Sequence, residues 1–165
     1  MTAVPRLSLP VAVIMGRKLV AGRGWQVPSW RVVGLVAGED LPGREAKGTP
    51  VHGSDEEQQF LWGGLRLELF RDVAESYWSN LTGTQPSLFV LCCENEEGAL
   101  VPKLVTADHD EAGSGVEVGD RVFAAPIPPE VYRHLEAFVI EHHLPQEKRK
   151  RKRADWSASG ESGES

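Results

Sequence analysis

The segment DVAESYWSNLTGTQPSLFVLCC, residues 72–93, decides the fold because it joins an amphipathic helix to a buried strand. We expect the helix to run from about residue 73 to residue 81, with a capping box at Asp72 and Glu75 and a stop at Thr82-Gly83. Residues 87–94 form a continuous apolar run, which is typical of a central strand covered on both faces. The helix presents one apolar face, made of Ala74, Tyr77, Trp78 and Leu81.

Shorter apolar runs on either side of this segment predict further strands, at residues 9–15, 29–36, 60–70, 100–106 and 121–127. Pro28 would mark a strand start, and Pro102 favours an edge position. We expect loops at residues 16–24 and 38–57. Residues 107–120 are acidic and rich in Gly, with room for one helical turn.

The last periodic segment begins at Pro129, a residue that suits the first turn of a helix, and predicts a helix that reaches about His143. Strands that precede one terminal helix indicate an α+β fold. We therefore expect an antiparallel, barrel-like sheet of about six strands, with a short internal helix and a long C-terminal helix.

The domain organisation follows from composition. Hydrophobic residues make up 41% of the chain, enough for a core, and we expect one α+β domain at residues 1–145. Residues 146–165 are charged, then rich in Ser, Gly and Glu, which predicts a disordered tail. No apolar run approaches the roughly 18 to 20 residues that span a bilayer, and two neighbouring cysteines suit a reducing cytoplasm rather than a disulfide framework.

The charge is divided unevenly along the chain. The net charge is -6, from 18 basic and 24 acidic residues. Six consecutive cations open the tail, and without them 12 basic residues stand against the 24 acidic ones. Such a basic tail can dock a protein partner, bind nucleic acid or anionic lipid, fold onto the acidic domain, or only keep the chain in solution. The six cations are Lys148, Arg149, Lys150, Arg151, Lys152 and Arg153.

Reactive side chains are present, but their pattern favours structure over chemistry. Cys92 and Cys93 point to opposite faces of one strand, and a buried thiol is inert because burial raises its pKa. A thiol-based enzyme would need one of them to meet His109 or His134. Residues 108–111 form a cluster of acidic and histidine side chains, which we interpret as a solvated loop. We expect no catalytic residues, no metal site and no cofactor.

The tryptophans divide into core and surface candidates. A small sheet needs large anchors, so we assign Trp30 and Trp78 to the core. Trp62 remains open between core and groove. Trp25 lies beside Gly24 in an expected loop and is a candidate partner-binding residue, together with the six cations of the tail.

Three stretches resemble a known family: WQVPSWR at residues 25–31, residues 65–91, and PIPPEVYRHLEAFVIEHH with the basic tail. The family is an uncharacterised bacterial domain-of-unknown-function family with an E-x-Y-x-x-N-L helix and a P-x-x-F-V-L strand. The likeness covers roughly residues 9–156, without the loop at 38–57. Those motifs are carried here by Glu75, Tyr77, Asn80 and Leu81, then by Pro86, Phe89, Val90 and Leu91.

Genes of that family tend to lie beside those of molybdenum-dependent formate dehydrogenase and its accessory factors. The resemblance therefore implies a role in assembly or maturation of that enzyme, and it carries over no catalytic residues. We expect a noncatalytic cytoplasmic accessory protein that binds a partner, for instance a formate dehydrogenase subunit or maturation factor. The alternatives are a redox or enzymatic protein that uses Cys92 or Cys93, and a nucleic-acid binder that uses the basic tail.

Overall fold

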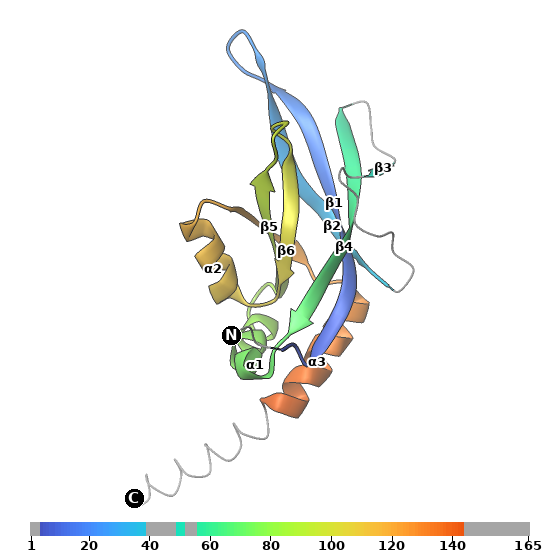
Figure 1. The fold of residues 1–165 in the computed structure, drawn as a ribbon, viewed down its shortest axis with the longest axis vertical. Coiled ribbons are helices and arrows are strands. Elements are labelled where there is room, and N and C mark those ends of the chain that lie inside the picture. Colours follow the sequence, from blue (N-terminus) through green and yellow to red (C-terminus); the bar gives the residue numbers. More distant parts are fainter. Residues whose placement is uncertain (1–3, 39–48, 52–55, 144–165) are drawn as a thin grey trace, which may run out of the picture.

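A computed structural model describes residues 4–38, 49–51 and 56–143, and the fold of this part is α+β (Figure 1). Its strands form two antiparallel sheets, one in the order β2-β1-β4-β3 and one in the order β6-β5-β7. The first sheet contains β1 (Leu7–Ala21), β2 (Gln26–Ala37), β3 (Thr49–Val51) and β4 (Glu57–Leu69). The second contains β5 (Ser87–Glu94), β6 (Leu100–Thr106) and β7 (Arg121–Pro126).

Three helices complete the described fold: α1 (Ala74–Leu81), α2 (His109–Glu117) and α3 (Pro129–His142). The expected single, barrel-like sheet of six strands is replaced by two open sheets. These two sheets share one hydrophobic core, to which α1 and α3 contribute side chains. Helix α3 begins at Pro129 as expected, but its 14 residues make it a helix of ordinary length rather than a long one.

The core is built from alternate residues of the strands. On β4, Leu65, Leu67 and Leu69 are buried, while Arg66 and Glu68 are exposed, as the alternation predicts. Strand β4 has a bulge at Gly63-Gly64, because Val11 on β1 pairs with Leu65 while Val13 pairs with Trp62. On the predicted apolar face of α1, Ala74, Tyr77 and Leu81 are buried and Trp78 is partly buried.

Strands β5 and β6 have the expected bounds, and β5 is the central strand of its sheet with β6 at one edge. Strands β1 and β2 are longer than expected. The predicted loop at residues 16–24 is wrong, because β1 continues to Ala21 and the turn starts only at Gly22. Pro28 lies inside β2 rather than at its start, which an edge strand tolerates because its outer N–H groups have no partner strand.

Three further expectations need correction. The short strand β3 lies in the segment expected to be a loop at residues 38–57. The capping box is wrong, because a 3-10 turn at Arg71–Val73 precedes α1 and no side chain caps either element. The single helical turn expected within residues 107–120 is the nine-residue helix α2, whose N-cap Asp108 accepts a hydrogen bond from the backbone N–H of Asp110.

The expected tail at residues 146–165, with Lys148 to Arg153, lies outside the described residues. Within the described part, the helices are too short and too polar to cross a lipid bilayer.

Candidate functional site

The hairpin of β1 and β2 extends beyond the other strands of the described fold (Figure 1). Every residue from Lys18 to Ser29 is exposed, and we call this segment the hairpin arm. The arm presents large apolar side chains to solvent, whereas Val11, Val13 and Met15, nearer the body on β1, are buried. The exposed fractions are 49% for Leu19, 45% for Val20, 64% for Trp25 and 45% for Val27.

The arm is an ordered ladder up to its turn. Val20 pairs with Val27 and Ala21 with Gln26, so the ladder continues to the last residues of both strands. The backbone N–H of Gly22 donates to the carbonyl of Trp25 over 2.6 Å and closes the turn. A side chain on Gly22 would place its Cβ 2.9 Å from the Trp25 indole nitrogen, so the absence of one lets the indole lie against the turn. Trp25 is therefore held at the end of the arm.

A carboxylate braces the root of the arm. Glu57 on β4 accepts two hydrogen bonds from the Arg31 guanidinium on β2, over 2.7 Å and 2.9 Å, and a third from the Gln59 amide over 3.0 Å. These donors lower the pKa of Glu57 to about 2. A Cβ on Gly16, in the β1 strand between them, would meet the Glu57 carboxylate at 2.6 Å. The missing side chain of Gly16 therefore lets β2 and β4 join across β1.

The hairpin is basic within an acidic chain. Residues 7–37 contain Arg17, Lys18, Arg23 and Arg31 and no Asp or Glu, while the whole chain has a net charge of -6. Arg31 is compensated by Glu57. The Arg17 guanidinium lies 5.8 Å from the centre of the Trp30 ring, a cation–π distance at the base of the arm. The arm therefore combines apolar side chains with positive charge.

The other tryptophans lie where the sequence analysis expects core residues or left the choice open. Trp30, Trp78 and Trp62 are partly buried and pack against the hydrophobic core. Trp25 alone among the described tryptophans is a large exposed apolar side chain. Lys148 to Arg153, the second expected partner-binding element, lie outside the described residues.

Sequence reasoning missed Leu19, Val20, Arg23 and Val27 as surface residues of the same arm. Their signal is a hairpin pattern, two short runs of strand-forming residues on either side of Gly22-Arg23-Gly24. Basic residues next to these runs favoured a loop instead.

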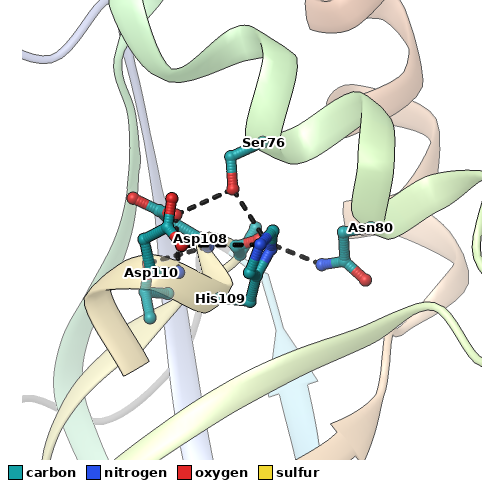
Figure 2. A network of polar contacts seen from close by, with 7 residues as sticks. Ser76, Asn80, Asp108, His109 and Asp110 are labelled. Atoms are coloured by element: carbon teal, nitrogen blue, oxygen red, sulfur yellow. Dashed lines mark hydrogen bonds and ion pairs between the residues drawn. The ribbon is translucent and has the colours of Figure 1, made fainter. Parts of the chain in front are cut away.

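Figure 2 shows the polar network that most resembles an active site, between α1 and the start of α2. The Ser76 hydroxyl lies 2.7 Å from an Asp108 carboxylate oxygen and 3.4 Å from the His109 imidazole. A catalytic serine gives its proton to an imidazole. Ser76 instead donates to Asp108, whose same oxygen also caps α2. The hydrogen bond from Ser76 to Asp108 therefore connects α1 to the start of α2.

Asn80 forms hydrogen bonds that connect α1 to the second sheet. Its amide donates to the carbonyl of Ser87 over 2.7 Å and to that of Ala107 over 3.0 Å, and its oxygen accepts from the N–H of Ser87 over 3.0 Å. The Tyr77 hydroxyl accepts from the N–H of Phe70 over 3.0 Å. Tyr77, Asn80 and the buried Leu81 of the helix motif thus have structural roles, while Glu75 is exposed.

The two thiols differ in environment. Cys92 is buried, and burial raises its pKa to about 12, so its reactive thiolate is scarce at neutral pH. Cys93 is exposed, and both thiols are free. Within residues 4–38, 49–51 and 56–143, no three His, Cys, Asp or Glu side chains gather closely enough to hold a metal ion. These groups offer no catalytic arrangement that rivals the arm as a candidate site.

Comparison with known proteins gives a family without a described activity. The family model described as "Protein of unknown function (DUF3305)" matches residues 10–152, which includes both helix and strand motifs. No curated protein and no solved structure matches the chain.

Proposed function

We propose that this chain, which belongs to the DUF3305 family of proteins of unknown function, is a noncatalytic accessory protein that binds a protein partner through its hairpin arm. The observation that carries this proposal is the exposure of the whole arm, residues 18–29, with four large apolar side chains in solvent. Exposed apolar clusters on a folded body are typical of interaction surfaces.

The energetics of the arm favour a partner. Burying one exposed valine, leucine or tryptophan side chain contributes on the order of 1 to 3 kcal/mol. The turn hydrogen bond and the Arg31–Glu57 brace already order the arm, which reduces the entropy lost on binding. Trp25 at the tip is suited to be the anchor, because tryptophan is enriched among residues that dominate binding energy.

The resemblance described above implies a particular partner. Members of the family are encoded beside formate dehydrogenase and its accessory factors, so a subunit or maturation factor of that enzyme is the first partner to test. The chain would then act by holding or delivering that protein. The basic residues Lys148 to Arg153 would add electrostatic attraction to the same partner.

The experiment compares the full chain with a variant whose arm is removed. Lys18 and Ser29 are directly paired, so Asn-Gly in place of residues 19–28 would close the hairpin with a two-residue turn. Every replaced residue is exposed, so the core stays intact. The matched control replaces two exposed valines near the end of α2, Val116→Ser and Val118→Ser.

Each protein is tagged and used to capture formate dehydrogenase components from native cells. We expect the full chain and the α2 control to capture the same partner and the arm variant to lose it. Equal capture by all three proteins, with the arm variant folded by circular dichroism, would remove the arm from the function.

A further inference from the structure

The inner side of the arm borders an open hollow of about 310 Å³. Its walls come from Val20, Val27 and Pro28 of the arm, from Trp30 farther along β2, and from Arg121 at the start of β7. Arg121 is the charged side chain among those that line it. Apolar walls with one guanidinium suit an apolar side chain next to a carboxylate.

Arg121 is placed to receive a carboxylate from outside the chain. Its guanidinium carbon lies 5.2 Å from the centre of the Phe123 ring, a cation–π distance. The neighbouring carboxylate, Asp120, is bound to Lys103 over 2.8 Å. That ion pair leaves the charge of Arg121 without compensation from the residue beside it.

The charge of the hairpin favours the same kind of partner. Arg17, Lys18 and Arg23 lie on the same hairpin, which has no acidic residue of its own. A basic hairpin on a chain of net charge -6 favours a negative partner segment over a basic one.

Other occupants fit less well. Two copies of the arm would bring like charges together in a symmetric dimer, and an arm bound to the acidic body of another copy would generate a ring or an open chain of molecules. Nucleic acid would meet repulsion from a chain with 24 acidic residues, and the exposed arm carries more large apolar side chains than cations.

We infer that the partner contributes an extended acidic segment in which an apolar side chain, flanked by Asp or Glu, enters the hollow beside Arg121. This inference rests on the proposed function and adds the chemistry of the partner to it. The apolar side chain packs against Val20, Val27 and Trp30, and a neighbouring carboxylate pairs with Arg121.

The test uses the full chain and short fluorescein-labelled peptides. One peptide alternates Glu and Leu, a second alternates Gln and Leu, and binding is followed by fluorescence anisotropy. We expect the Glu peptide to bind at least about tenfold more tightly, because one interfacial charge pair is worth on the order of 1.4 kcal/mol or more. Raising the salt concentration should lower the affinity for the Glu peptide and leave the affinity for the Gln peptide unchanged.

Variants of the arginines locate the site. Arg121→Glu should lower the affinity for the Glu peptide about tenfold or more. Arg121→Lys should retain part of that affinity because the positive charge remains. Arg133→Glu, an exposed position on α3, is the matched control and should change nothing. Arg23→Glu gives a second charge reversal, in the turn of the arm, where no packing would be disturbed.

Equal affinity for the Glu and Gln peptides, or an Arg121→Glu variant that is folded and binds unchanged, would overturn the inference. Tighter binding of a single-stranded oligonucleotide, lost in the same variants, would replace the acidic peptide by nucleic acid. If the native partner is captured only when the arm is present, but both charge-reversal variants still capture it, this inference is wrong and the proposed function stands. If the arm variant also captures the partner, the proposed function is wrong.

Discussion

Replacing Asn80 tests whether the helix motif is structural. In Asn80→Ala three hydrogen bonds are lost, two from the amide to the carbonyls of Ser87 and Ala107 and one from the Ser87 N–H. At about 1 kcal/mol net for each bond the loss is about 3 kcal/mol. Alanine is the better helix former by about 0.5 kcal/mol, so we expect a net loss of about 2.5 kcal/mol in the free energy of unfolding.

The assay is equilibrium unfolding in urea, followed by circular dichroism. Ser79→Ala, an exposed neighbour on the same helix, is the control and should stay within about 0.5 kcal/mol of the natural chain. Asn80→Asp keeps the acceptor for Ser87 but places a carboxylate against two carbonyl oxygens, so it should not rescue stability. A loss below about 1 kcal/mol for Asn80→Ala would refute the structural reading and return the network of Figure 2 to consideration as a site of chemistry.

Three further outcomes follow from particular side chains. With a thiol-reactive dye at neutral pH, one label per folded chain should locate to exposed Cys93, and buried Cys92 should react only after unfolding; rapid double labelling would contradict this. Gly115→Ala should lower the free energy of unfolding by about 1 kcal/mol, because its Cβ would lie 2.5 Å from a methyl carbon of Leu91, while Gly113→Ala, with open space around it, should raise that energy by up to about 1 kcal/mol. The lowered pKa of Glu57 stabilises the fold above its ordinary value near 4.5, and this contribution disappears as the pH falls toward 2. Because Arg31 is 56% exposed the contribution is at most about 1 kcal/mol, and Glu57→Gln should lack this acid dependence in urea titrations across that range.

The parts of the fold that the sequence predicts well are those whose burial is regular. The strands β5 and β6 have their expected bounds because an unbroken apolar run and an edge proline are strong local signals. The face of α1 and the alternation on β4 follow from periods of 3.6 and 2 residues. In each case the core faces one side of the element and imposes its period on the residue types.

The arm was not predicted because the core imposes no alternation of apolar and polar residues on a segment that lies outside it. Beyond Gly16 both faces of the hairpin become exposed, so Lys18, Val20 and Arg23 follow no burial pattern that separates strand from loop. The length of α2 was missed for a different reason. Gly113 and Gly115 lower helix propensity, yet Gly115 is the residue that lets α2 approach Leu91 closely, which is a tertiary requirement.

The separation into one sheet or two also depends on long-range contacts. The strands β4 and β5 are joined through α1, and the network at Asn80 fixes where the second sheet begins relative to that helix. Local patterns contain the strands but not this placement.

Site-specific photocrosslinking in native cells tests the central claim most directly, namely that the arm touches another protein. A photoreactive p-benzoylphenylalanine replaces Trp25, which is 64% exposed, in one protein and Val116 on α2, which is 58% exposed, in another. The account predicts a discrete adduct with one partner from position 25 and none from position 116. Adducts from position 116 with none from position 25, in a folded protein, would contradict it.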